Sequence, residues 1–277
     1  MLVLIKGAGD LATGVALRLH RSRIQVVMTD IERPTAVRRT VAFCQCVYDG
    51  VHTVEGVAAR RAAGVESVRT ALAAGEIPVV VDPAAEILDK LPFDALVDAI
   101  LAKKNLGTRL TDAPVVLALG PGFTAGADCH GVVETMRGHD LGRLILEGPA
   151  KPNTGVPGDV AGFSKERLIR ASADGTFHPL RAIGDLVEKG DVVATVDGVP
   201  VLANMSGMVR GMLPDGLFVK TGMKAGDVDA RTVREHCFTV SDKARAIGGG
   251  VLEGLLHFGA GASREGDAGR GPRPCLP

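Results

Sequence analysis

A glycine-rich turn after an apolar run constrains the fold of this chain more than any other feature. Leu2 to Ile5 is a continuous apolar run, which is typical of a strand buried on both faces of a parallel sheet. The turn Gly7-Ala8-Gly9-Asp10-Leu11-Ala12 follows at once, and apolar residues at helical spacing continue to about His20. A strand, a tight turn and a helix in this order predict the opening of an α/β sheet.

Further apolar runs alternate with helical stretches and extend this opening into a sheet. Ile24 to Met28 is the second expected strand, and Glu66 to Ala74 is an expected helix. The remaining strand candidates are Ile77 to Val81, Ala95 to Ile100, Val115 to Leu119, Val132 to Thr135 and Leu144 to Leu146. This alternation predicts an α/β fold with a Rossmann-like parallel sheet domain over residues 1–168. Asp49-Gly50, within an alternating run from Tyr48 to Gly56, predicts an inserted β-hairpin.

Near Ala171 the sequence pattern changes to short β-like runs separated by glycines. The spacing from Gly175 to Gly207 recurs from Gly184 to Gly216 and from Gly190 to Gly222. Such self-similarity predicts one structural unit used twice, as two half-barrels of a small all-β domain over residues 169–232. This half-repeat resembles the barrel-sandwich domains that carry biotin or lipoate.

The expected hairpin between the half-repeats has Asp197-Gly198 at its tip, a favoured two-residue turn. Because this tip offers no amine to acylate, we expect no covalent biotin or lipoate. Lys189, Lys220 and Lys224 lie away from the tip and are interpreted as solvated turn residues.

The C-terminal part is expected to be a helical segment over residues 233–258 and a disordered tail over residues 259–277. Ser241 can cap the last helix, while Gly248, Gly249 and Gly250 weaken its helical pattern and instead allow close backbone packing. The tail is rich in Gly, Arg and Pro without periodicity.

Charge and composition exclude several classes of function. Lys plus Arg and Asp plus Glu are 32 each, so no net field attracts nucleic acid, and the chain has no Trp and one Tyr to stack on bases. The apolar runs are far shorter than the roughly 20 residues that cross a bilayer. With no signal-peptide pattern and an odd number of cysteines, five, we expect a cytoplasmic protein with reduced thiols that binds neither membrane nor nucleic acid.

The glycine turn also has the spacing of the dinucleotide fingerprint, Gly-x-Gly-x-x-Ala, in the required strand-to-helix context. Asp30 ends the second expected strand, where a carboxylate can accept hydrogen bonds from ribose hydroxyls. The alternative is that the glycines only make a tight turn. The candidate cofactor-binding residues are Gly7, Gly9, Asp10, Ala12, Asp30, Lys103, Lys104, Asn105, Gly120, Gly122, Thr124 and Gly126.

A second glycine loop, Gly120 to Gly126, follows another expected strand. It lacks the Gly-Lys-Ser/Thr ending of a Walker A loop, but its amides could form an anion nest. A plain connecting loop explains it about as well. Lys103, Lys104 and Asn105 also follow a strand and could bind phosphate, although loop lysines are more often solvated.

Cysteine and histidine residues give no metal site by spacing. Cys44 and Cys46 offer two thiols, and Cys129 would be a reactive thiolate if His130 lowered its pKa. Buried inert cysteines are the commoner case. No metal ligand and no catalytic residue is assigned.

Several longer stretches resemble the YqeB family, accessory proteins of selenium-dependent molybdenum hydroxylase systems. The resemblance begins at Lys6 to Gly14 and covers nearly everything except the tail. Its other segments are Ile31 to Thr40, Val97 to Asn105, Leu119 to Gly126, Glu134 to Gly142 and Cys237 to Glu253. The N-terminal part is also similar to the Rossmann domain of xanthine dehydrogenase accessory factors.

The resemblance implies an accessory or maturation factor that binds a nucleotide or the phosphate-bearing molybdenum cofactor and presents it to an apo-hydroxylase partner. An NAD(P)-dependent oxidoreductase is a second interpretation, for which no acid–base pair can be assigned. A non-catalytic interaction scaffold with a degenerate pocket is a third. Whether the protein is an enzyme stays open at this point.

Overall fold

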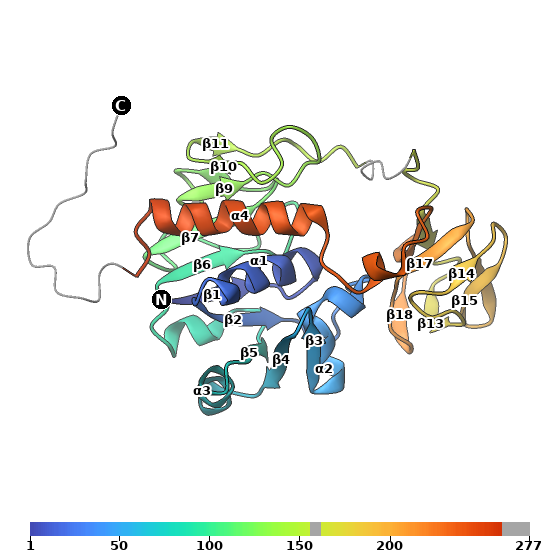
Figure 1. Ribbon diagram of the computed structural model, residues 1–277, viewed down its shortest axis with the longest axis horizontal. Coiled ribbons are helices and arrows are strands. Elements are labelled where there is room, and N and C mark those ends of the chain that lie inside the picture. The colour runs from blue at the N-terminus through green and yellow to red at the C-terminus, as the bar shows by residue number, and fades with distance from the viewer. Residues whose placement is uncertain (156–161, 262–277) are drawn as a thin grey trace, which may run out of the picture.

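The computed structural model describes residues 1–155 and 162–261, which form two units (Figure 1). The larger one, here the α/β unit, is built on a sheet with β1 (Leu2–Lys6) at its centre. Across the sheet, the strands are β10 (Leu144–Ile145), β9 (Gly131–Val133), β7 (Val115–Leu119), β6 (Ala95–Asp98), β1, β2 (Gln25–Asp30), β5 (Ile77–Val81), β4 (Val57–Ala62) and β3 (Val51–Val54).

Two long helices cover one face of this sheet, whereas one helix and irregular segments cover the other. The helices are α1 (Asp10–Arg21), α2 (Cys46–Asp49), α3 (Val65–Ala73) and α4 (Asp242–His257), with 3-10 turns at Arg39–Val41, Phe43–Gln45, Glu86–Asp89 and Arg234–Cys237. One face packs on α1 and α4 through residues such as Leu17 and Ile247. The other packs on α3 and irregular segments, through residues such as Val68 and Phe93. A short ladder joins β8 (Thr124–Ala125) to β11 (Gly148–Pro149).

The predicted Rossmann-like domain is wrong as a description of this unit. Its sheet is mixed, because the edge strands β3 and β10 each pair antiparallel with their neighbours. Within the described residues, α1 lies between the parallel strands β1 and β2, and α3 lies between β4 and β5. The connections from β5 to β6 and from β6 to β7 contain no α-helix in these residues. The helix that shares a face with α1 is α4, from the far end of the chain.

The α1 and α4 helices lie parallel and very close together. A Cβ built on Gly14 would lie 2.6 Å from the Ala244 Cβ, and one built on Gly248 would lie 2.9 Å from the Gly14 carbonyl oxygen. The close backbone packing expected for Gly248, Gly249 and Gly250 is therefore confirmed for Gly248 and Gly250, but not for Gly249. Ser241 caps α4 as expected, since its Oγ accepts a hydrogen bond from the Ala244 N–H at 3.2 Å.

The smaller β unit comprises two antiparallel sheets. One has the order β12 (Leu168–Arg170), β19 (Lys224–Asp229), β17 (Gly207–Met212) and β14 (Leu186–Val187), and the other β16 (Val199–Leu202), β15 (Val192–Val196), β13 (Gly175–Pro179) and β18 (Leu217–Val219). The half-repeats exchange strands, because β13 pairs with β18 and β17 with β14. The predicted biotinyl- or lipoyl-like barrel is wrong, since within the described residues no strand pair joins the two four-stranded sheets.

Both predicted hairpins are present, but only one has its turn at the predicted dipeptide. Val196 pairs with Val199, which places Asp197-Gly198 at the tip with φ of 45° and 85°. Asp49-Gly50, in contrast, ends α2, and the turn between β3 and β4 is made by Glu55-Gly56.

The helices of the described residues do not reach the combination of length and apolar character that crossing a bilayer requires. Of the predicted tail, residues 262–277 lie outside the described residues.

Candidate functional site

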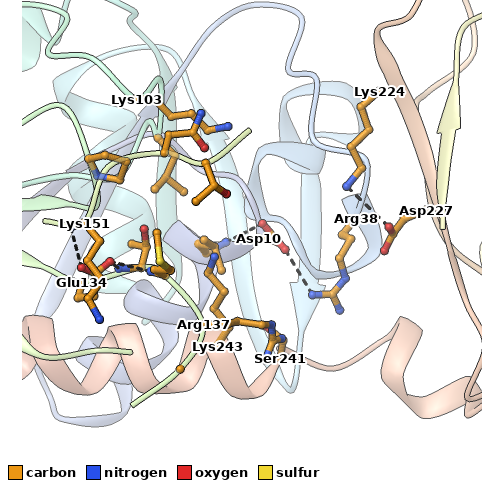
Figure 2. A pocket seen from close by; sticks show the side chains of 18 of the residues that line it. Asp10, Arg38, Lys103, Glu134, Arg137, Lys151, Lys224, Asp227, Ser241 and Lys243 are labelled. Carbon is orange, nitrogen blue, oxygen red and sulfur yellow. Dashed lines mark hydrogen bonds and ion pairs between the residues drawn. The ribbon is translucent and has the colours of Figure 1, made fainter. Parts of the chain in front are cut away.

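A cavity of about 790 Å³, here called the basic cavity, lies where loops of the α/β unit meet the β unit (Figure 2). Because β1, β6, β7 and β9 run parallel, the segments after their carboxyl ends reach the same edge of the sheet. Its charged lining residues are Asp10, Arg38, Lys103, Glu134, Arg137, Lys151, Arg167, Arg210, Lys224, Asp227 and Lys243. Eight of these are cationic and three anionic, so the lining favours an anion.

Two parallel helices direct their N-termini at this cavity. Asp10 and Leu11 from the first turn of α1 line it, as do Ser241 and Lys243 at the start of α4. The N-terminus of an α-helix carries roughly half a positive charge from aligned peptide dipoles. The helix ends therefore add to the positive potential of the side chains.

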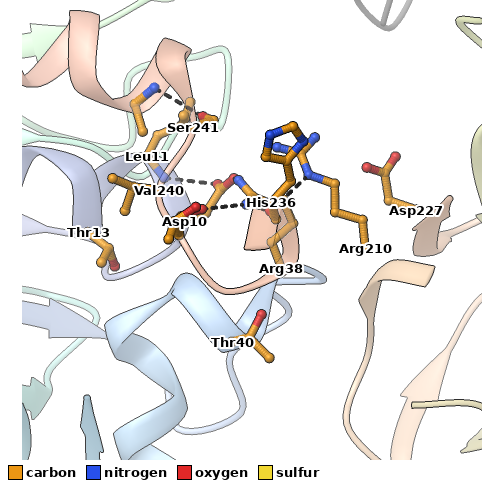
Figure 3. A network of polar contacts seen from close by, with 12 residues as sticks. Asp10, Leu11, Thr13, Arg38, Thr40, Arg210, Asp227, His236, Val240 and Ser241 are labelled. Atoms are coloured by element: carbon orange, nitrogen blue, oxygen red, sulfur yellow. Dashed lines mark hydrogen bonds and ion pairs between the residues drawn. The ribbon is translucent and has the colours of Figure 1, made fainter. Parts of the chain in front are cut away.

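Arg38 and Arg210 form a buried group of two guanidiniums in the wall of the basic cavity (Figure 3); the residues are 7% and 6% exposed. Arg38 Nη1 donates to Asp10 Oδ2 at 3.3 Å, and its Nη2 donates to the carbonyl oxygens of His236 and Thr239, each at 3.1 Å. Arg210 Nε donates to the same His236 carbonyl at 3.4 Å. Burial, followed by the charge of Arg38, lowers the pKa of Arg210. An anion close to both would relieve this repulsion.

The β unit contributes carboxylates that partly neutralise its own cations. Asp227 accepts hydrogen bonds from Arg167 Nη2 at 2.8 and 2.9 Å, and Lys224 Nζ lies 3.8 Å from it. Asp229 accepts from Arg231 Nη2 at 2.6 Å and lies 3.6 Å from Arg210 Nε. Burial alone would raise the pKa of Asp229, but the Arg231 hydrogen bonds and nearby charges lower it to about 2.

This pKa makes stability depend on pH in a defined window. The folded value of about 2 lies below the ordinary 3.8, so the contribution of Asp229 is complete above about pH 4 and is lost as the pH falls through 2. We expect Asp229→Asn to lower stability by about 2 kcal/mol at pH 7, and the difference from the wild type to shrink towards pH 2.5. Urea denaturation followed by far-UV circular dichroism across this range measures it. A deficit that stays constant with pH would contradict the assignment.

Glu134 shapes the opposite wall of the basic cavity. The residue is 2% exposed, and its Oε1 accepts hydrogen bonds from the N–H groups of Thr135 and Met136, each at 2.7 Å. Its Oε2 accepts from the Lys151 N–H at 2.9 Å (Figure 2). One carboxylate thus holds two lining segments, 134–138 and 151–154, in place.

Lys103 and Lys243 differ from the other lining cations. Within the described residues neither forms an ion pair within 4 Å, whereas the other six have carboxylate partners. Burial, and then the charge of Arg137, lowers the pKa of Lys243. Lys103 and its neighbour Leu101 have φ of 62° and 61°, a backbone strain for non-glycine residues that often marks ligand sites.

The fingerprint residues line a second cavity of about 440 Å³, here called the glycine-turn cavity. The structure brings together Gly7, Gly9, Asp10, Ala12 and Asp30 there. Asp30 Oδ2 accepts a hydrogen bond from the Ala8 N–H and Oδ1 from the Ile31 N–H, both at 2.8 Å, so its carboxylate braces the turn. Burial raises the pKa of Asp30.

The other predicted binding residues are not brought together with this set. Lys103 lines the basic cavity, but Lys104, Asn105, Gly120, Gly122, Thr124 and Gly126 line neither cavity. Gly122 packs on the Lys104 backbone, and Gly120 packs on Thr135. Asn105 closes its own loop, since its Oδ1 accepts from the Gly107 and Thr108 N–H groups at 2.8 Å.

Cys44, Cys46, Cys129 and Cys237, the cysteines of the described residues, are buried and free. Burial raises the pKa of Cys129 and of Cys46 to about 12, and that of Cys44 well above its usual range. His130 Nδ1 accepts a hydrogen bond from the Val116 N–H at 2.9 Å. These thiols are therefore not activated. Among the described residues, no three Cys, His, Asp or Glu side chains gather to hold a metal.

Sequence reasoning missed most of the basic cavity. The charged lining residues that were absent from the predicted binding set are Arg38, Glu134, Arg137, Lys151, Arg167, Arg210, Lys224, Asp227 and Lys243. Glu134 and Lys243 lie in stretches that carried the family resemblance, and their positions after β9 and at a helix start were the available signals. Arg167, Arg210, Lys224 and Asp227 belong to the β unit, where no local pattern marked them.

Comparison with solved structures finds, at low similarity, proteins described as aspartoacylases or succinylglutamate desuccinylases. An aspartoacylase family protein from Mesorhizobium loti is 14% identical, with 82% of this chain and 84% of that chain covered and a TM-score of 0.27. A succinylglutamate desuccinylase/aspartoacylase from Rhodobacter sphaeroides is 17% identical, with the same coverage and a TM-score of 0.26. At these scores no substrate or activity carries over to this chain.

The mixed sheet and the two antiparallel sheets correct the fold that was predicted from the sequence. The predicted maturation or accessory factor for a selenium-dependent molybdenum hydroxylase, with nucleotide binding in a Rossmann crevice, is wrong, because the sheet that was expected to form this crevice is mixed. The NAD(P)-dependent oxidoreductase rested on the same fold prediction and is corrected with it, whereas the non-catalytic scaffold did not rest on that fold and stays a prediction.

Comparison with curated sequences gives a much stronger match. No family model matches the chain. The uncharacterized protein YqeB of Escherichia coli (strain K12) is 53% identical over 267 residues, which are 95% of this chain and 49% of YqeB. The chain thus spans about half the length of the relative that it matches, and nothing in the match concerns molybdenum hydroxylases. Almost the whole chain is therefore similar in sequence to about half of YqeB.

Proposed function

We propose that this protein binds a small anion bearing at least two negatively charged groups, carboxylate or phosphate, in the basic cavity. The observation that carries the proposal is the surplus of cations: eight line the cavity, and Lys103 and Lys243 have no ion-pair partner among the described residues. Lys103 is exposed, but Lys243 is half-buried, and a half-buried cation without a partner is costly unless a ligand neutralises it.

The arrangement of the cations favours a ligand with more than one charge. Figure 2 places Lys103 and Lys243 on loops and a helix of the α/β unit, and Lys224 across the cavity on the β unit. Arg38 and Arg210 also line the cavity and are already buried. A single charge would satisfy one side, whereas a dianion can contact cations from both units.

Isothermal titration calorimetry with pyrophosphate and with citrate tests the proposal. We expect both to bind, with affinity that falls as salt is raised, because exposed charges are screened. Lys103→Gln and Lys243→Gln should each weaken pyrophosphate binding by about tenfold, the effect of losing one charge contact of about 1.4 kcal/mol.

Lys220→Gln is the matched control. Lys220 lies on the β unit, pairs with Asp174 at 3.0 Å and lines neither cavity, so its loss removes the same charge without touching the site. Binding that is absent for both anions, or that responds to Lys220→Gln as much as to Lys243→Gln, would contradict the proposed function.

A further inference from the structure

The glycine-turn cavity has an unusual apolar rim. Ile31, Ile100 and Leu106 are 45%, 37% and 51% exposed, and all three line this cavity. They come from three separate segments: the end of β2, the end of β6 and the loop that follows it. Large apolar side chains that converge on one cavity while remaining exposed are typical of a surface that a ligand covers.

The interior of the glycine-turn cavity is also largely apolar. Its wall includes Ala36, Val37, Pro34, Pro83 and Ala99, together with the backbone of the glycine turn. Of its charged lining residues, Asp10, Arg38 and Lys224 are shared with the basic cavity, and Asp30, at the end of β2, would repel a second anionic group. The cavity therefore suits an uncharged, largely apolar group.

The two cavities adjoin each other. Asp10, Leu11, Arg38, Leu101 and Lys224 line both. A ligand whose charged groups contact Arg38 and Lys224 can therefore extend past Asp10 into the glycine-turn cavity without leaving the protein surface.

The loop that carries Leu106 is held in place by side-chain hydrogen bonds. Asn105 Nδ2 donates to the Thr108 carbonyl at 2.7 Å, and Thr108 Oγ1 donates to Asp98 Oδ2 at 2.7 Å. The buried Lys6 ammonium in turn donates to Thr108 Oγ1 at 2.7 Å. Leu106 is therefore fixed at its exposed position before any ligand arrives, which lowers the entropy cost of binding.

We infer that the ligand is amphipathic: an anionic head lies in the basic cavity, and an uncharged apolar body lies in the glycine-turn cavity against Ile31, Ile100 and Leu106. The inference rests on the proposed anion binding and adds to it the chemical class of the rest of the molecule.

The test compares three probes by calorimetry: pyrophosphate, inorganic phosphate and phenyl phosphate. Phenyl phosphate should bind about tenfold more tightly than inorganic phosphate, since burying the ring removes on the order of 60 Å² of apolar surface from water. Leu106→Ser should reduce that advantage several-fold and leave pyrophosphate binding unchanged. Leu180→Ser, which removes an equally exposed leucine (60%) from the β unit, should alter none of the three affinities.

The outcomes separate the two proposals. If pyrophosphate binds but the phenyl group adds nothing, or adds as much in Leu106→Ser as in the wild type, the apolar subsite is wrong and the proposed anion binding stands. If none of the three probes binds, both proposals are overturned.

Discussion

Replacing Gly250 by alanine is expected to destabilise the protein by about 3 kcal/mol. A Cβ on Gly250 would overlap the Gly142 carbonyl oxygen and lie 2.9 Å from Val133 Cγ1. Neither obstacle can move cheaply, because one is backbone and the other belongs to a buried strand. Overpacking of this kind costs roughly 1–3 kcal/mol, and a backbone clash belongs at the upper end, even after the higher helix propensity of alanine is counted.

Gly249→Ala is the control one position away in the same helix. A Cβ there would meet no atom within 4 Å, so the substitution should stabilise the protein by about 0.5–1 kcal/mol through helix propensity alone. Urea denaturation followed by circular dichroism measures both variants. Equal midpoints for the two would show that α4 does not approach Gly142 as closely as described.

Glu134→Ala should have the second large effect, a loss of about 5 kcal/mol together with loss of pyrophosphate binding. The substitution leaves three N–H groups without the carboxylate that now accepts their hydrogen bonds, and each such bond to a charged group contributes roughly 1.5–3 kcal/mol. Because those groups hold the segments 134–138 and 151–154, the wall of the basic cavity loosens with them.

Asp128→Ala provides the comparison for Glu134→Ala. The Asp128 carboxylate accepts one N–H hydrogen bond, from Thr124 at 2.8 Å, and does not line the basic cavity. Its removal should cost about 1 kcal/mol and spare pyrophosphate binding. If Glu134→Ala were no more harmful than this control, the carboxylate would not be the group that organises the wall.

The two hairpins show which parts of the fold local sequence can predict. Asp197-Gly198 has the left-handed backbone that its residue types favour, so its turn was predictable. The other turn lies at Glu55, whose φ of 48° is stabilised by distant groups: Arg21 and Arg245 donate to its carboxylate, as does the Val240 N–H. Partners 34 to 190 positions away leave no trace in a local pattern.

The candidate site likewise has one part that the local sequence predicted and one part that it did not. Gly7, Gly9 and Asp30 were predictable because one strand, one turn and the next strand bring them together over a short span. The basic cavity draws on residues from Asp10 to Lys243, and its charges become a set only when α4 packs on α1 and the β unit meets the sheet edge. Neutral overall charge concealed this local surplus.

The pairing of α1 with α4 also bears on how the chain is made. Arg18 and Arg245, which are joined by a hydrogen bond between these helices, lie 227 positions apart. A chain leaving the ribosome therefore completes most of the large sheet, then the entire β unit, before the helix that covers Gly14 and its neighbours has been synthesised. For that interval α1 keeps an uncovered apolar face, which a chaperone or a second nascent chain can occupy, and contacts across so long a loop form slowly.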